Sequence, residues 1–285
     1  MPLKDAISIY GPNLIGTFFC SIALALLGTQ LASRSESLQA FVASQSASLG
    51  ITSGLALVVL LTGDTEAYPH IPVILAFVFS TSFYFFAQKL SARFRSKSTE
   101  ILITLFLFSL SVNYLVTGVL PYLESHFSAS FMGDIATASA TSSYLLALVS
   151  FAISSLLLSR MRQINFQSFW ISSSNVSFSH TLQVLFYFVC ALLIVESTRV
   201  FGFLYTSASL VVIPLAASLA AKSFKHFLSL VVGLSAISSL LGFIISLWSL
   251  KLSTSACIVT AQVFLSILAI IIYQFQDRLL RNRSK

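Results

Sequence analysis

Charged residues are scarce in this sequence. Lys, Arg, Asp and Glu make up 9% of its 285 residues, whereas a soluble domain carries about 25%. Hydrophobic residues make up 56%, and the mean hydropathy is +0.92. So few charges cannot cover the surface of a soluble protein of this length, and the composition therefore predicts an integral membrane protein.

Cysteine is also scarce, and the three cysteines show no paired spacing. Cys20, Cys190 and Cys257 each lie inside an apolar segment, which is typical of small buried residues. The N-terminal stretch MPLKDAISIY has neither the basic region nor the cleavage site of a signal peptide. We therefore expect the first apolar segment to remain as a span.

Several chemical motifs are missing altogether. The chain has no G-x-x-x-x-G-K-[ST], H-E-x-x-H, G-x-S-x-G or C-x-x-C pattern. None of its four histidines has a second histidine or a carboxylate at helical spacing inside the membrane. These absences argue against catalytic residues, a directly bound cofactor and an intramembrane enzyme, and they favour a transporter or channel.

Long apolar runs are what the chain does contain. Each has about the 20 residues that a spanning helix needs, and the alternating ten-residue strands of a membrane barrel are absent. We therefore predict an all-α polytopic transmembrane helical bundle, with residues 1–285 forming one domain of eight to nine spans. The nine candidates are 9–31, 38–62, 71–88, 101–120, 141–159, 181–201, 203–221, 227–250 and 255–275.

The basic residues predict the orientation. With the N-terminus outside and nine spans, 13 of the 16 Lys and Arg residues fall inside, as the positive-inside rule requires. The chain is thus expected to be a multi-pass protein of a cell membrane with its C-terminus in the cytoplasm. The net charge of +7 reflects this topology and not nucleic-acid binding, because no basic face with interleaved aromatics lies outside the membrane.

Polar residues within the spans are the default pointers to a transport path. Ser37, Ser44 and Ser48 share one stripe of the second span, and Gln45 lies beside them. This stripe predicts either a hydrated path or a tight helix–helix seam. Asn113 in the fourth span is interpreted as an interhelical hydrogen bond.

Glu196 and Arg199 are three residues apart near the outer end of the sixth span. This spacing places them on one helical face, where they can form an ion pair. Two interpretations stay open, a self-neutralising pair at the interface and a gate on the path.

Two loops are longer than a turn requires. The outer one, 121–140, is rich in small and polar residues and is expected to form a re-entrant segment or a short surface helix. In the inner one, 160–180, Phe166, Phe169 and Trp170 can share one face of a short helix along the membrane surface. That helix would be either an interfacial anchor or a docking site for a cytoplasmic partner.

Four stretches resemble the membrane permease subunits of bacterial ABC importers for zinc, manganese or iron. They are LASRSESLQAFVASQSASLG (31–50), FMGDIATAS (131–139), RVFGFLYTSASLVVIPLAASLA (199–220) and LGFIISLWSLKLSTSACIVTAQVFLSIL (241–268). The resemblance extends from about residue 11 to 275. It identifies Gly133 and Asp134 with the family's outer-loop Gly-Asp pair, and Gly202 and Pro214 with its Gly and Pro positions. Both of the latter are candidate points of helix bending.

The chain departs from the family at its metal ligands. The family's second helix carries an Asp and, four residues later, a His, and in this register these positions are Ser37 and Phe41. The Phe-Asp-Pro start of the inner loop reads Phe166, Gln167 and Ser168. Divalent ions prefer carboxylate, imidazole or thiolate ligands, so no metal site is carried over.

The resemblance implies the permease subunit of an ATP-binding-cassette importer that works by alternating access. Its implied partners are a cytoplasmic ATPase that binds ATP and docks on residues 166–174, an extracytoplasmic substrate-binding protein, and a second permease, identical or related. The expected path residues are Ser37, Phe41, Ser44, Gln45, Ser48, Glu196 and Arg199. The alternatives are a self-contained secondary transporter of a small metabolite and a non-transporting relative of the permease.

Overall fold

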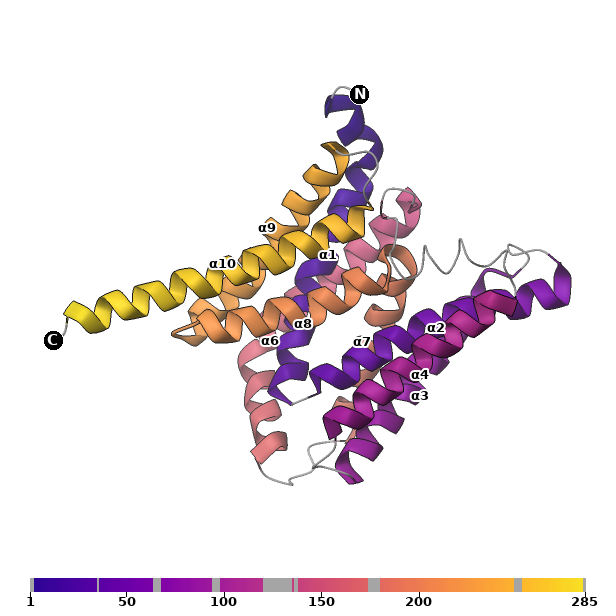
Figure 1. Ribbon diagram of the computed structural model, residues 1–285, viewed down its shortest axis with the longest axis horizontal. Helices are drawn as coiled ribbons and strands as arrows, with labels where there is room; N and C mark the ends of the chain where they lie inside the picture. Colours follow the sequence, from indigo (N-terminus) through magenta and orange to yellow (C-terminus); the bar gives the residue numbers. More distant parts are fainter. Residues whose placement is uncertain are drawn as a thin grey trace.

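The computed structural model describes residues 3–34, 36–63, 68–93, 98–119, 135, 138–173, 180–248 and 253–283. Within these ranges the chain forms nine long α-helices and no strand (Figure 1). The helices are α1 (Leu3–Ser33), α2 (Ser37–Thr62), α3 (His70–Arg93), α4 (Ser98–Val119), α6 (Ala140–Ser173), α7 (His180–Phe201), α8 (Phe203–Ala220), α9 (Phe224–Trp248) and α10 (Thr254–Arg283).

Each of these nine helices contains an apolar stretch long enough to cross a membrane. The described residues therefore confirm the predicted all-α polytopic bundle, and the spans agree with the predicted ranges to within a few residues. The inner segment differs from the prediction of a separate short helix. Residues 160–173 continue α6 without a break, because nothing between Arg160 and Ser173 is a Gly or Pro that would end the helix.

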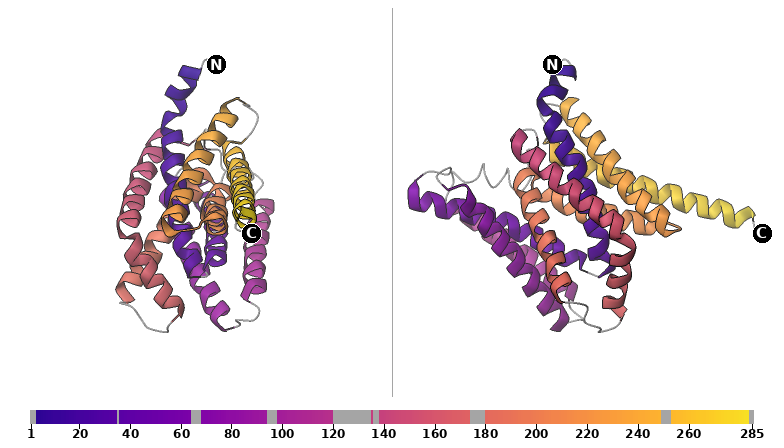
Figure 2. Two further views of the ribbon diagram at one scale, coloured as in Figure 1. Left: turned by 90° about the vertical axis from the view of Figure 1, so that its left-hand side faces the viewer. Right: turned by 180° about the vertical axis from the view of Figure 1, so that it is seen from behind.

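The helices form two groups (Figures 1 and 2). Helices α2, α3 and α4 pack together, while α1, α6, α8, α9 and α10 make the larger group. Helix α7 contacts α2, α3 and α8, so it joins the two groups. The main buried cluster lies in the larger group and includes Leu24, Tyr205 and Phe243.

Glycines set the closest helix crossings. A Cβ atom at Gly50 or Gly54 of α2 would lie 2.4 Å from the Cα of Ala76 or 2.5 Å from the Cα of Pro72, both in α3. These two glycines are four residues apart, as in the small-residue motif that brings membrane helices into contact. Helix α3 therefore packs backbone against backbone on α2.

The three cysteines are free and buried. Cys20 is in α1, Cys190 in α7 and Cys257 in α10, and all three are less than 10% exposed. The interpretation of the cysteines as small core residues is confirmed.

Candidate translocation path

The first half of α2 is the most polar buried segment of the bundle. Ser44, Gln45, Ser46 and Ser48 are all fully buried. The hydroxyl of Ser44 donates to the Phe41 carbonyl, and that of Ser46 to the Ala43 carbonyl, each at 2.9 Å. These bonds within the helix satisfy the hydroxyl groups, so these serines pack as small residues.

Gln45 differs from the serines around it. Neither its Nε2 nor its Oε1 has a hydrogen-bond partner within the described part of the chain, although the side chain is fully buried. A buried carboxamide without partners is costly in free energy, and such groups in native proteins call for an explanation. The explanation that fits a transport protein is a water molecule or cargo that pairs with Gln45 in a working state.

A second carboxamide lies across the α2–α4 seam. Asn113 of α4 donates from Nδ2 to the hydroxyl of Ser48 at 3.4 Å. This contact confirms the predicted interhelical hydrogen bond of Asn113. Its Oδ1 has no partner among the described residues, so it leaves an oxygen acceptor on the same helix pair as Gln45.

An aromatic cluster lies one helical turn before Gln45. We use this name for Phe41 of α2, Phe106 of α4 and Phe203 of α8, whose ring centroids are 4.8 to 6.0 Å apart. The cluster joins three helices at the start of the polar stripe. Apolar rings at such a place exclude water, so the cluster can act as a constriction.

The break between α7 and α8 determines where Phe203 lies. Gly202 has φ 89° and ψ 161°, a region that is open almost only to glycine. Thr206 donates to the Gly202 carbonyl at 2.9 Å and contacts the hydroxyl of Ser197 at 3.0 Å. These bonds hold the two helix ends together across the break.

Pro214 lies within α8, which stays helical from Phe203 to Ala220. Gly28 of α1 packs against this point. A Cβ on Gly28 would lie 2.1 Å from the Leu210 carbonyl oxygen and 2.8 Å from the Pro214 ring. That carbonyl is the one that proline leaves without its helical partner, so α1 covers the site where the hydrogen bond is missing.

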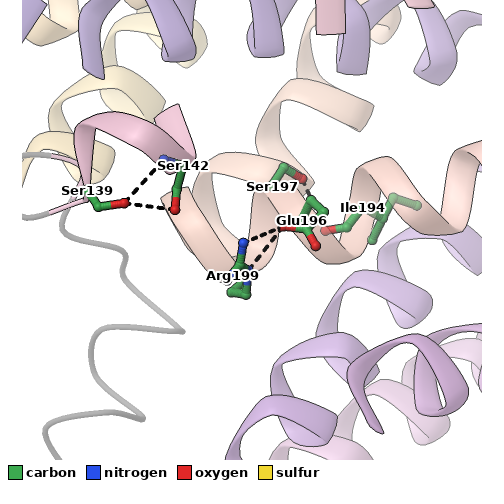
Figure 3. Close-up of polar contacts among 6 residues, drawn as sticks. All are labelled: Ser139, Ser142, Ile194, Glu196, Ser197 and Arg199. Atoms are coloured by element: carbon green, nitrogen blue, oxygen red, sulfur yellow. Dashed lines mark hydrogen bonds and ion pairs between the residues drawn. The ribbon is translucent and has the colours of Figure 1, made fainter. Parts of the chain in front are cut away.

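Glu196 and Arg199 form an ion pair on one face of α7 (Figure 3). The Nη2 and Nε atoms of Arg199 lie 2.8 and 3.0 Å from Oε2 of Glu196, and the side chains are 39% and 25% exposed. Among the described residues neither side chain bonds to the α2 stripe. This geometry favours the self-neutralising pair over a gate.

Two predicted sites are described only in part. Gly133 and Asp134 lie outside the described residues. The backbone of Phe166, Gln167, Phe169 and Trp170 is helical, within the last turns of α6. Their proposed roles in docking stay predictions.

No group of three or more His, Cys, Asp or Glu residues suited to a metal ion occurs in the described ranges. On α2, Ser37 is half-buried and Phe41 packs in the aromatic cluster. These two positions thus offer one hydroxyl group and none of the carboxylate, imidazole or thiolate ligands that a zinc site uses.

Comparison with known proteins identifies the family. The sequence pattern described as the ABC 3 transport family matches residues 7–273. The chain belongs to this family. Membership confirms the predicted resemblance and the role of the chain as the permease subunit of an ABC transporter.

A search of curated proteins finds no match to this ABC 3 family chain. Among solved structures it is similar to PsaBC from Streptococcus pneumoniae in complex with Fab, with a TM-score of 0.70 and 19% identity. The match covers 93% of each chain. This likeness shows that the two chains share a fold over nearly their whole length.

The sequence alone did not single out two polar sites of this ABC 3 family chain. Gln262 of α10 donates to the hydroxyl of Ser209 in α8 at 2.9 Å, and Glu36 accepts hydrogen bonds from α3 and α7. The Gln262–Ser209 contact could have been found from the sequence, because a lone Gln within the apolar run of α10 points to a polar contact inside the membrane. The partners of Glu36 lie 48 and 151 residues away, so no local spacing could predict them.

Proposed function

We propose that this chain is the permease of an importer of divalent metal ions, zinc, manganese or iron, and that the cargo passes along the first half of α2. The observation that carries the proposed path is the buried and unpartnered carboxamide of Gln45, beside the Ser48–Asn113 contact. Family membership and the resemblance of residues 31–50 and 199–220 support the choice of cargo.

In this proposal α2 binds the ion weakly and transiently, and it holds no permanent metal site. Carboxamide and hydroxyl oxygens replace part of the hydration shell of a cation without holding it tightly. Weak binding is useful in a path, because an ion that binds tightly leaves slowly. The aromatic cluster closes the proposed path on one side of this transient site until the helices around Gly202 rearrange.

Three partner proteins belong to this proposal. A cytoplasmic ATPase docks on residues 166–174, a substrate-binding protein docks on the outer loops around residues 133–134, and a second permease completes the path. ATP binding on the ATPase shifts the permease between outward-facing and inward-facing states. Such a shift requires only that ATP-bound ATPase binds one state more tightly than the other.

The docking proposal is tested by purification from the native membrane. We expect an ATPase to co-purify with the detergent-solubilised wild-type chain and to be lost with Trp170→Ala. Wild-type chain that purifies alone would contradict ATPase docking. Equal recovery of the ATPase with both chains would remove Trp170 from the docking surface.

The path is tested by a matched pair of substitutions, Gln45→Leu and Gln262→Leu. Both replace a buried Gln in a span, but Gln45 has no bonds to lose, whereas Gln262 loses its bonds to Ser209 and Ser21. We expect Gln45→Leu to keep or raise thermal stability, because it removes an unsatisfied group, and to lower metal uptake about ten-fold or more.

The expected result for Gln262→Leu is the reverse. Stability falls by about 1–3 kcal/mol because Ser209 and Ser21 lose a partner, while uptake per folded molecule stays near wild type. Stability is measured by thermal unfolding in detergent, and uptake with radioactive zinc or manganese in vesicles. Normal uptake by Gln45→Leu would contradict the proposed path.

A further inference from the structure

A buried carboxylate lies at the corner between α1 and α2. Glu36 is 8% exposed and accepts hydrogen bonds from the Tyr84 hydroxyl at 2.6 Å, the Tyr187 hydroxyl at 2.9 Å and Gln88 Nε2 at 3.2 Å. We call these four residues the Glu36 hub. Tyr84 and Gln88 belong to α3 and Tyr187 to α7, so one side chain ties the start of α2 to two other helices.

The same corner also binds α7 through its basic residue. The guanidinium carbon of Arg34 lies 4.1 Å from the ring centroid of Phe186 and 5.6 Å from that of Tyr187. Cation–ring contacts at these distances are attractive. Both charged residues of the α1–α2 corner therefore rest on the same turn of α7.

The hub connects two parts of the proposed transporter. Tyr187 lies seven residues after the start of α7 at His180, roughly 10 Å along the helix. In the sequence, six residues (174–179) separate His180 from the end of α6, where we propose that the ATPase docks. Glu36 directly precedes α2, which carries Gln45. A displacement of the start of α7 thus reaches the proposed path through this carboxylate, beside the direct packing of α7 on α2.

The packing beside the hub leaves a small void. A small pocket there is lined by both tyrosines and by small residues that include Ala43, Ser80 and Ala191. The hydroxyl of Ser80 has no hydrogen-bond partner among the described residues. The two tyrosine rings, whose centroids are 5.2 Å apart, border this pocket, and its volume of about 20 Å³ allows only a small shift of either ring.

We propose that Glu36 is a positioning residue that couples α7 to α2, so that movement driven by the ATPase opens and closes the path. The proposal rests on the proposed function. It assigns different tasks to the two tyrosines, because Tyr187 receives the movement from α7 whereas Tyr84 anchors the carboxylate to α3. A purely structural hub would leave the ratio of metal uptake to ATP hydrolysis unchanged when either hydroxyl group is removed.

The test uses the assembled transporter in vesicles and measures metal uptake and ATP hydrolysis in the same preparation. Tyr187→Phe and Tyr84→Phe each remove one hydroxyl group from the same carboxylate, so they are a matched pair. We expect Tyr187→Phe to lower the ratio of uptake to ATP hydrolysed by about five-fold or more, the scale of a coupling between sites. For Tyr84→Phe we expect the ratio to fall by less than about two-fold.

Glu36→Gln supplies the second variant, since it keeps the shape of the side chain and removes the charge. Glu36→Gln is expected to lower the ratio of metal uptake to ATP hydrolysed at least as much as Tyr187→Phe does. Tyr144→Phe, an exposed position on α6, is the control and leaves the ratio unchanged. The purified yield and the thermal midpoint of each variant establish that it is folded and assembled.

Two outcomes would overturn the coupling role. An unchanged ratio in Tyr187→Phe, or an unchanged ratio in Glu36→Gln, would show that the hub only stabilises the fold. A loss of uptake that tracks the loss of folded protein would show the same. If the wild-type assembly takes up no metal, the proposed function itself fails, and the coupling role fails with it.

Discussion

At the residue scale, the polar groups of this bundle fall into three kinds. Many serines of the described helices bond back to their own helix, as Ser44 does to the Phe41 carbonyl. Others join helices, as Asn113 does to Ser48. Gln45 and Glu36 form the third kind, since Gln45 has no partner among the described residues, and Glu36 joins three side chains from two helices. These two residues carry the functional proposals.

The sequence predicted the second kind, in the interhelical bond of Asn113, and not the third. Helical spacing places Ser37, Ser44 and Ser48 on one stripe, and it correctly pairs Glu196 with Arg199. Whether Gln45 lies against a partner, or which tyrosines reach Glu36, depends on contacts between helices far apart in the chain. Helical periodicity contains no information on such contacts.

The ion pair of Glu196 and Arg199 gives the first prediction. Both side chains are more than one fifth exposed and bond to each other, and exposed pairs contribute at most about 1 kcal/mol. The double variant Glu196→Gln with Arg199→Gln is expected to keep its unfolding midpoint and its metal uptake. A marked drop in uptake with unchanged stability would instead assign the pair to a gate.

Gly28 gives the second prediction. Gly28→Ala places a Cβ 2.1 Å from the Leu210 carbonyl oxygen, which forces α1 away from α8 and costs about 1–3 kcal/mol, as overpacking does. The matched control is Gly233→Ala in α9, where a Cβ meets nothing within 4 Å. There the loss of backbone freedom in the unfolded chain raises stability by up to about 1 kcal/mol.

Thermal unfolding of both glycine variants in detergent checks this pair. A drop in midpoint for Gly28→Ala together with no drop for Gly233→Ala is the predicted pattern. Equal midpoints would mean that α1 and α8 are not in close contact at Pro214.

At the element scale, the proposed path depends on how α2 packs against α4, α7 and α8. Close crossings at Gly50 and Gly54 fix α3 on α2, while the break at Gly202 directs Phe203 into the aromatic cluster. The sequence predicted the spans because their hydropathy is high. It did not predict that α6 continues to Ser173. The aromatic and Ser-rich composition of 160–173 is as typical of a short surface segment as of the end of a spanning helix.

Gly202 gives the prediction at this scale, with Gly63 as its control. Gly202→Asn is expected to cost about 1–3 kcal/mol, because φ 89° with ψ 161° is open almost only to glycine. Gly63 has φ 76° and ψ −1° at the end of α2, a left-handed conformation that Asn tolerates. Gly63→Asn is therefore expected to unfold near the wild-type temperature, and a comparable loss in both would contradict the strained break.

At the scale of the whole molecule, the nine apolar helices of the described residues predict that the two termini lie on opposite sides of the membrane. The basic residues predict that the N-terminus is outside and the C-terminus is in the cytoplasm. Reporter fusions to either terminus in intact cells check this orientation. A C-terminal reporter that is active only outside would reverse the docking sides proposed for the ATPase and the substrate-binding protein.

The most direct test of the account is metal accumulation by vesicles that hold the wild-type chain and the ATPase that co-purifies with it. The account predicts that zinc, manganese or iron accumulates only when ATP is supplied to the ATPase side. It also predicts that dissipating ion gradients has no effect. Accumulation that needs an ion gradient and no ATP would contradict the account and identify a self-contained secondary transporter.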